Sequence, residues 1–248
     1  MHAEELITVE LKIGSERIRL ELQFSSARVQ AVQLLPLLQA LADKVVAVGV
    51  REAESKGRAI SCRKGCGACC SQLVPVSEPE ALYLLQLIES MPEDRQRLVR
   101  ERFSRNRRLV EEAGLLEEVA VSVSVGARKI RREVGLRYFK LGLPCPFLEQ
   151  GACSIHPHRP LSCREYLVVS TPEACARPEF GGVEKVVFPR NLSTILYAFG
   201  DGEGDDEMRV VPLVLLHEWG AKHPPERLPS FEPACYVENF LRKLAGSC

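Results

Sequence analysis

The sequence has no net charge and no long apolar run, and each absence excludes a class of function. Lys plus Arg and Asp plus Glu both number 33 among 248 residues, so no overall field attracts nucleic acid or a membrane surface. The longest uninterrupted apolar run, residues 210–216, includes Pro212 and is far shorter than the roughly 18 residues needed to cross a bilayer. We therefore expect no membrane span, and any charge-driven binding must be local.

The start of the chain also lacks the apolar core of a secretory signal, and it carries acids at Glu4 and Glu5. We therefore expect the protein to stay in the cytoplasm, where thiols remain reduced. The sequence shows no internal repeat, phosphate-binding loop, protease arrangement or pair of catalytic carboxylates. His217 with Glu218 lacks the second histidine of a zinc-protease helix motif.

What is present predicts a folded α+β protein, because 46% of the residues are hydrophobic and 27% are charged. Two alternating runs over residues 6–24, separated by Gly14 and Ser15, predict a β-hairpin. Helical spacing follows over residues 27–53, with Pro36 as a start or kink. We expect a mainly helical body with this N-terminal hairpin and two cysteine-rich irregular loops around a metal centre.

Helix signals continue after the first cysteine group. Ser77 with Glu80 forms a capping box for a helix with a stripe at Leu82, Leu85 and Ile88, ending near residues 91–92. Ser90 with Glu93 repeats the box, for a helix to Gly114 whose inward residues are Leu98, Phe103, Leu109 and Val110. Residues 119–125 alternate like a strand among helical neighbours, and that choice stays open. Residues 143–178 are proline-rich and predict loop, and residues 210–219 predict a helix opened by Pro212.

These signals suggest three parts, which together could form a single domain. Residues 1–60 hold the hairpin and first helix, residues 61–180 form a cysteine-cluster metal-binding domain, and residues 181–248 are a C-terminal extension packed on the same body.

The cysteines carry the strongest functional signal. Ten are present, and eight fall between positions 62 and 175, next to glycine and proline, where little core is available to bury them. Clustered thiols in a reducing compartment indicate metal binding rather than disulfides. The candidate ligands are Cys62, Cys66, Cys69, Cys70, Cys145, Cys153, Cys163 and Cys175. Cys235 and Cys248 are isolated, and we expect them to be inert thiols.

The two cysteine groups differ in their predicted local structure. In the first, SCRKGCGACC, Gly65 and Gly67 disfavour a regular helix and favour a tight loop close to a metal centre. In the second, residues 149–151 form the turn of a short hairpin that places Cys145 and Cys153 on its two arms. The second segment has few apolar anchors, so bound metal would stabilise it by on the order of 10 kcal/mol.

Thiolates on a metal leave excess negative charge that cations or hydrogen-bond donors must offset, because four of them on one divalent ion sum to about minus two. Arg63, Lys64, Arg159 and Arg164 stand beside the sulfurs in sequence, and the last two are the candidate cofactor-binding cations. His156 or His158 would donate a hydrogen bond or coordinate directly, and the alternative is that all of these are solvated loop residues.

The combined motifs resemble the YkgJ-type cysteine-cluster family, described as a putative zinc- or iron-chelating domain. The first motif is Cys62-RKG-Cys66-GA-Cys69-Cys70, and the later one contains PCPFLEQGACSI and HRPLSCR, over about 100 of the residues in two blocks. The resemblance implies chelation by seven cysteines, accompanied by three further residues: Cys62, Cys66, Cys69, Cys70, Cys145, Cys153 and Cys163, with Arg159, Pro160 and Arg164. Position 156 is usually aromatic in that pattern and is histidine here.

The identity of the metal stays open between an iron–sulfur cluster and zinc. A structural zinc module usually supplies two cysteine pairs, each spaced by two residues, and only Cys66 with Cys69 fits that spacing. The adjacent Cys69 and Cys70 suit a polynuclear centre or two ions better than one zinc ion, which favours iron–sulfur. The electron or protein partner stays unidentified.

Two further classes of function stay open. The spacing of Cys62, Cys66 and Cys69 resembles radical S-adenosylmethionine enzymes, although Ala68 replaces the usual aromatic and no barrel pattern follows. Flagellin lysine methylases are similar to the family in their cysteine pattern, which implies an iron–sulfur, S-adenosylmethionine-dependent protein lysine methylase as an alternative. Residues 95–140 hold 13 basic and 6 acidic residues, which suggests a zinc-stabilised nucleic-acid-binding module. Sparse aromatics and the amphipathic helix pattern disfavour nucleic acid as a partner.

Overall fold

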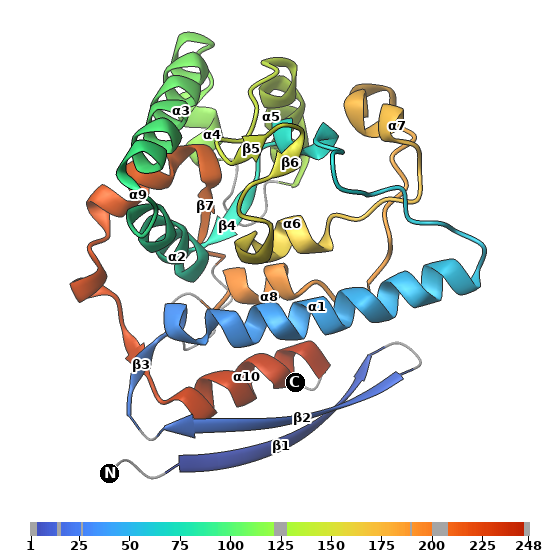
Figure 1. The fold of residues 1–248 in the computed structure, drawn as a ribbon, viewed down its shortest axis with the longest axis vertical. Coiled ribbons are helices and arrows are strands. Elements are labelled where there is room, and N and C mark those ends of the chain that lie inside the picture. Colours follow the sequence, from blue (N-terminus) through green and yellow to red (C-terminus); the bar gives the residue numbers. More distant parts are fainter. Residues whose placement is uncertain are drawn as a thin grey trace.

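The computed structural model describes residues 4–13, 16–25, 27–121, 128–188, 190–199 and 208–245. It is mainly helical, with small two-stranded sheets that include the N-terminal hairpin, which confirms the expected α+β class. Figure 1 shows the hairpin along one end of the molecule, a helical layer next to it, and the cysteine-bearing loops between that layer and the remaining helices. The predicted turn at residues 14–15, the acidic segment at 201–207 and Cys248 lie outside the described residues.

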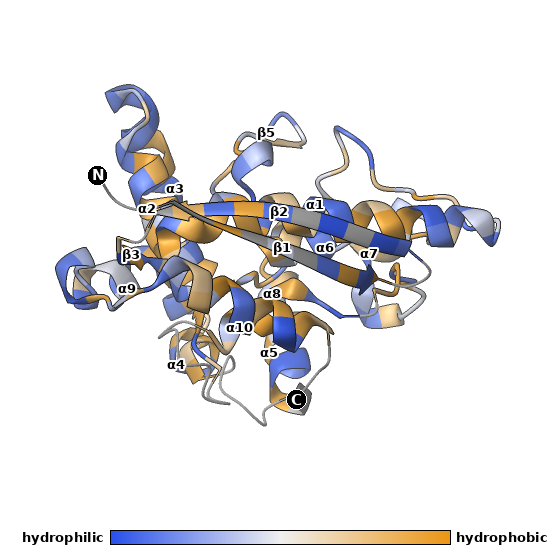
Figure 2. Cartoon of the chain, turned by 90° about the horizontal axis from the view of Figure 1, so that it is seen from below, coloured by the Kyte–Doolittle hydropathy of each residue, from blue (hydrophilic) through white to orange (hydrophobic). Residues whose placement is uncertain are grey.

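The first layer is built from the hairpin and two long helices. Strands β1 (Glu4–Ile13) and β2 (Glu16–Ser25) pair antiparallel, and Leu11 and Phe24 are buried on the face that packs against α10 (Pro233–Ala245). Helix α1 (Ala31–Ser55) lies on the other side of α10 in Figure 1, and Figure 2 shows the two strands running across these helices. The alternation of apolar and polar residues therefore produces the hairpin that it predicts.

The expectation that the chain has no membrane span rested on uninterrupted apolar runs, and helix α1 bears on it. Its length and composition suffice for a bilayer span, although polar residues such as Gln39 and Asp43 interrupt the run. Within its most apolar window, 56% of the residues are buried inside the molecule. Leu35, Leu38 and Ala42 lie in the largest apolar cluster, so protein packing accounts for the apolar character of α1.

The second layer begins with α2 (Glu78–Glu89), and the predicted capping box at its start is confirmed. Ser77 accepts a hydrogen bond from the Glu80 N–H, and the Glu80 carboxylate accepts one from the Ser77 N–H at 2.8 Å. Before the helix, β4 (Pro75–Ser77) pairs antiparallel with β7 (Val210–Pro212). Residues 210–212 are thus a strand, and the predicted helix opened by Pro212 is wrong. Helix α9 (Leu216–Lys222) starts later, after the short 3₁₀ turn η4 (Leu213–Leu215).

Helix α3 (Glu93–Glu112) differs from its predicted pattern at two points. Its N-cap is Pro92, which forms no side-chain cap, and Ser90 instead donates its hydroxyl to the Leu87 carbonyl, so the second capping box is wrong. Leu98 is exposed, whereas Phe103 and Val110 are buried as predicted. The buried residues of α3 follow one another at spacings of four, three and four residues, and they define the face that packs on the core: Val99, Phe103, Asn106 and Val110.

The remaining elements are short, and several of them connect the layers. Residues 116–121 form α4 (Leu116–Val121), which settles the open choice for that part in favour of helix, while residues 122–125 lie outside the described residues. The other elements are α5 (Arg128–Lys140), β5 (Leu148–Glu149), β6 (Ala152–Cys153), α6 (Leu161–Glu165), α7 (Pro172–Ala176), α8 (Leu192–Tyr197), and the pair β3 (Val29–Gln30) with β8 (Ser230–Phe231). Short 3₁₀ turns complete the set: η1 (Ala68–Ser71), η2 (His156–His158), η3 (Pro178–Phe180) and η5 (Pro225–Arg227).

Candidate metal centre

The first cysteine group forms the tight loop expected from its glycines rather than a regular helix. Cys66 N–H donates to the Arg63 carbonyl at 3.0 Å, and Cys70 N–H donates to the Gly67 carbonyl at 2.9 Å. Gly65 has φ +90°, a left-handed conformation that glycine adopts without strain. The 3₁₀ turn η1 then presents Cys69 and Cys70 from adjacent positions.

The second group contains the predicted hairpin. Strand β5 pairs with β6, and the turn residues Gln150 and Gly151 have φ +50° and +76°, as a two-residue hairpin turn with both φ values positive requires. Cys153 lies on β6, and Cys145 precedes β5 by three residues, where its carbonyl accepts the Leu148 N–H. Two further short helices carry the remaining cysteines of the cluster, Cys163 on α6 and Cys175 on α7.

Backbone contacts join the two cysteine groups directly. Cys145 N–H donates to the Cys70 carbonyl at 2.7 Å, which ties residues 75 positions apart in sequence (145 minus 70). The glycines permit a second close approach, because a Cβ on Gly151 would lie 3.1 Å from the Gly65 carbonyl oxygen. Residues from distant motifs are therefore held side by side before any metal is considered.

The close approach at Gly151 gives a testable prediction, with a control variant whose free energy of unfolding should change in the opposite direction. Gly151→Ala places a Cβ against the Gly65 backbone at a positive φ, and we expect it to lower the free energy of unfolding by about 1–2 kcal/mol. Gly135→Ala adds a Cβ in α5, where nothing lies within 4 Å, and we expect it to raise stability by up to about 1 kcal/mol. Urea unfolding of both variants measures the difference, and equal effects would contradict the packing described.

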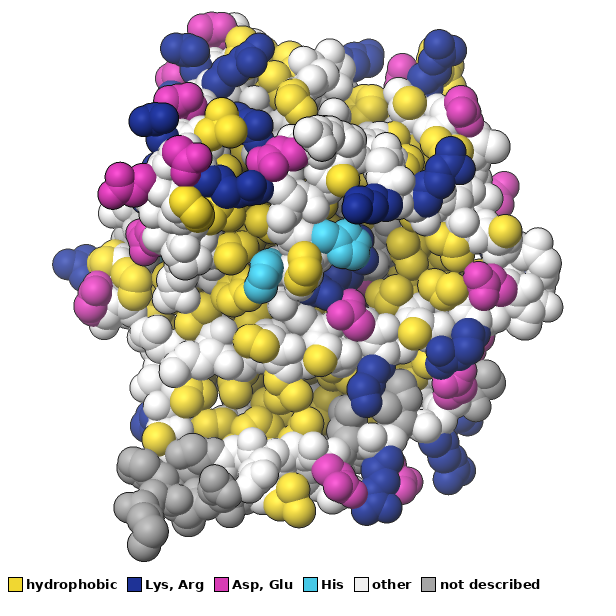
Figure 3. Space-filling view, in the orientation of Figure 1, with side chains coloured by type: hydrophobic (Ala, Val, Ile, Leu, Met, Phe, Trp, Pro, Cys, Tyr) yellow, Lys and Arg dark blue, Asp and Glu magenta, His cyan; other side chains and the backbone are white. Residues whose placement is uncertain are grey.

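Helix α3 positions the second cysteine group through its polar side chains. The Glu149 carboxylate pairs with Arg95 at 3.1 Å and with Arg102 at 3.2 Å, and Arg102 also donates to the Pro146 carbonyl at 3.0 Å. Asn106, which is buried, donates its amide to the Pro144 carbonyl at 2.8 Å. These contacts account for part of the basic surplus of residues 95–140. Figure 3 shows acidic and basic side chains interspersed on the displayed face.

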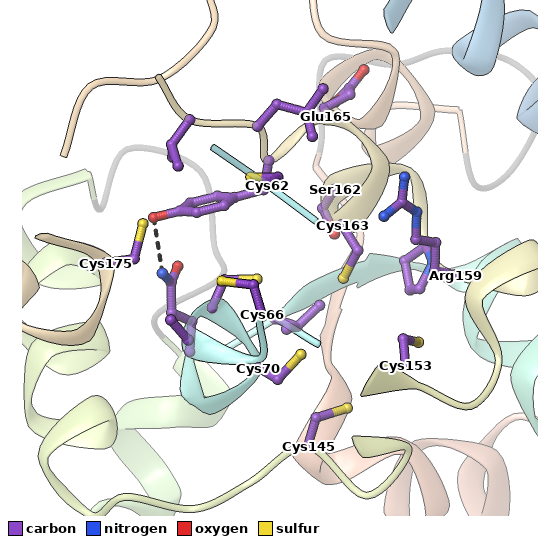
Figure 4. A pocket seen from close by; sticks show the side chains of 18 of the residues that line it. Cys62, Cys66, Cys70, Cys145, Cys153, Arg159, Ser162, Cys163, Glu165 and Cys175 are labelled. Carbon is purple, nitrogen blue, oxygen red and sulfur yellow. Dashed lines mark hydrogen bonds between the residues drawn. The ribbon is translucent and has the colours of Figure 1, made fainter. Parts of the chain in front are cut away.

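All eight clustered cysteines line one cavity of about 1140 Å³. They come from the first loop, the β5–β6 region, α6 and α7. Figure 4 shows Cys70, Cys145, Cys153 and Cys163 around one side of it, with Cys62, Cys66 and Cys175 on the other. The nine cysteines of the described residues are free, and Cys235 is exposed on α10, away from this cavity. The sequence therefore identified the thiols that gather, and it separated Cys235 from them.

Burial keeps most of these thiols protonated in the absence of a metal. A hydrogen bond with Cys70, together with burial, raises the pKa of Cys69, and burial raises the pKa of Cys145 to about 12. Burial also raises the pKa of Cys62, Cys153, Cys163 and Cys175. A metal that binds here must therefore displace protons from the sulfurs.

The two arginines proposed to accompany the cofactor lie in different places. Arg159 lines the cavity, and its charge lowers the pKa of Cys62 and Cys153, in each case against a larger effect of burial. Arg164 does not line the cavity. Its buried guanidinium pairs with Asp43 of α1 at 2.8 Å and donates to the Arg159 and Pro157 carbonyls. Arg164 thus fixes the loop that carries Arg159.

The other basic candidates also differ in whether they line the cavity. Arg63, Lys64 and His156 line the cavity, whereas His158 lies outside its lining and makes a 2.7 Å hydrogen bond with the Tyr83 hydroxyl. Charge from Arg159, followed by burial, lowers the pKa of His156. A neutral imidazole can coordinate a metal or accept a hydrogen bond.

The residues fit a thiophilic metal centre by two observations. Thiols are the soft donors that select zinc and iron–sulfur clusters, and the buried Nε of Arg159 has no acceptor among the described residues, although a thiolate or sulfide would supply one. Across the described ranges, no three His, Cys, Asp or Glu side chains are arranged to hold a single ion. The sulfurs surround a space that is larger than one ion needs.

Several residues that line the cavity are not predicted from the sequence. Tyr166 lines it and accepts a hydrogen bond from Gln72 at 2.9 Å, and Lys185 stands 4.3 Å from the centroid of the Tyr166 ring. Buried Glu165 also lines it, and it receives hydrogen bonds from Asn191, Ser193 and the start of α8. No spacing rule connects these positions to the cysteines, since their proximity arises from tertiary packing.

The fold and the cavity define a class of protein in which a helical α+β body holds a cluster of thiols supplied by irregular loops. The model of the CxxCxxCC family, described as "Putative zinc- or iron-chelating domain", matches residues 61–180. This match confirms the resemblance seen in the two motifs. No curated protein and no solved structure shows significant similarity to the chain.

Proposed function

We propose that the protein binds an iron–sulfur centre through the thiolates of its two cysteine-rich segments and Cys175. The observation that carries the proposal is the convergence of eight thiols on one cavity of about 1140 Å³. Arg159 would donate its unpartnered Nε–H to a sulfur and offset negative charge. The centre would supply electron transfer or Lewis acidity. The location that we propose is the cytoplasm, because thiols that bind a metal must stay reduced.

The number and placement of the thiols favour a polynuclear centre over one zinc ion. A closed structural zinc site uses four ligands, half of the thiols that line the cavity. Cys69 and Cys70 are adjacent on η1, so both sulfurs reach one tetrahedral ion only with strain. Two zinc ions are the runner-up, because eight thiolates provide two sets of four.

Anaerobic purification followed by metal and sulfide analysis tests this proposal. We expect iron and acid-labile sulfide in stoichiometric amounts and a broad visible absorption band that is lost on oxidation. Colourless protein with stoichiometric zinc would support the runner-up instead. Protein that is isolated without either metal, and that takes up neither under reducing conditions, would contradict both.

A further inference from the structure

The segment 171–183 leaves the body and returns to it at an isolated antiparallel bridge between Val168 and Lys185, and it carries Cys175 on α7. Antiparallel backbone hydrogen bonds close its base: Val169 N–H donates to the Glu184 carbonyl at 2.9 Å, and Val186 N–H donates to the Leu167 carbonyl at 2.8 Å. Figure 1 shows α7 set apart from the helical body, and α7 contacts η1, which carries Cys69 and Cys70. Segment 171–183 therefore contacts the body at its base and at the first cysteine loop.

Cys175 is the residue that anchors this segment to the body. Its side chain is 4% exposed and is the one buried side chain in residues 171–183, all of which are described. Phe180, the one aromatic residue in the segment, is 80% exposed, and it is followed by two glycines with positive φ. Ordering a chain segment costs conformational entropy that buried contacts must offset, and a single small thiol offers little apolar surface for that purpose.

We propose that residues 171–183 form a lid over the thiol cavity, held closed by a bond between the Cys175 sulfur and the metal centre. This inference rests on the proposed function. Pro172 and Cys175 both line the cavity, and Figure 4 shows Cys175 at its edge, across from Cys145 and Cys153. As the sulfur–metal bond forms, the thiol proton leaves to solvent, and the lid acquires a strong anchor. Without metal, the lid keeps its closed base and loses the anchor at α7.

Coupling of this kind makes lid closure and metal retention one equilibrium, because a ligand that binds only the closed state stabilises that state. The lid would also set the rate at which metal leaves. A Cys175→Ser variant keeps the other seven thiols, so we expect it to hold metal but to release it at least about tenfold faster to a chelator.

Hydrogen exchange measured by mass spectrometry on the full chain tests the lid. Wild type is compared in the metal-loaded and the chelated state, together with loaded Cys175→Ser and the control Cys235→Ser, whose thiol is exposed and remote. We expect amides of residues 171–183 to exchange at least about tenfold faster in chelated wild type and in Cys175→Ser. The control should match loaded wild type. Cleavage by chymotrypsin after Phe180 gives a second readout on wild type alone, faster without metal.

The outcomes separate this inference from the proposed function, because metal content is measured on every sample. If loaded wild type contains metal, and if its residues 171–183 exchange amide hydrogens or are cleaved as fast as in chelated protein, the lid proposal is wrong and the proposed metal centre stands. If loaded Cys175→Ser protects residues 171–183 as well as wild type does, the Cys175 anchor is wrong. If wild type takes up no metal, the proposed function fails first.

Discussion

Replacing Cys69 with serine is expected to lower metal affinity by well over tenfold and to abolish the visible absorption of the loaded protein. Cys69 lies on η1 and lines the cavity. A thiolate at Cys69 would raise the pKa of five other cysteines, in each case as a smaller effect than burial: Cys62, Cys145, Cys153, Cys163 and Cys175. Because these five cysteines belong to both cysteine-rich segments and to α7, loss of Cys69 should affect the whole centre.

Metal content, sulfide content and competition with a chelator measure the effect of Cys69→Ser. Cys235→Ser is the matched control, since it removes one exposed thiol on α10 and should retain full metal content. Circular dichroism of both variants in the chelated state separates loss of metal from loss of fold. A Cys69→Ser protein that binds metal as tightly as the control would show that the centre does not depend on the Cys69 sulfur.

The elements that the sequence predicts are those determined by local chemistry. The hairpin β1–β2 follows from strict alternation, the start of α2 from its capping box, and the β5–β6 turn from glycine at a positive φ. The gathering of the cysteines was also predicted, because thiols next to glycine and proline have few other partners. In each case the signal lies within a few residues of the structure that it produces.

The features that the sequence does not predict depend on contacts across long separations. Residues 210–212 have an apolar run compatible with helix, but β4 offers them a strand partner about 135 positions earlier (211 minus 76). Arg164 stands beside Cys163 in sequence, yet its side chain turns away to Asp43. A periodicity cannot specify which distant residue will supply the partner, and a short motif cannot specify which way a side chain points.

The second large effect is expected at Glu80, whose role extends beyond capping α2. Its carboxylate is buried and accepts hydrogen bonds from the Ser77 N–H and hydroxyl, each at 2.8 Å, and from the Leu161 N–H at 2.6 Å. Leu161 opens α6, which carries Cys163, so Glu80 fixes a cysteine helix to α2. Burial raises the pKa of Glu80, and the donors from Ser77 and Leu161 lower it in part.

Replacing Glu80 with alanine leaves two backbone N–H groups without acceptors in the core, and we expect a loss of about 3 kcal/mol in the free energy of unfolding of metal-loaded protein. Glu78→Ala, in the same first turn but without such contacts, should cost less than about 0.5 kcal/mol. Because Glu80 holds the start of α6, its loss should also weaken metal retention, which a chelator competition on the same samples measures. A loss below about 1 kcal/mol for Glu80→Ala would mean that solvent or rearranged backbone satisfies these donors, and that α6 is positioned by the metal rather than by α2.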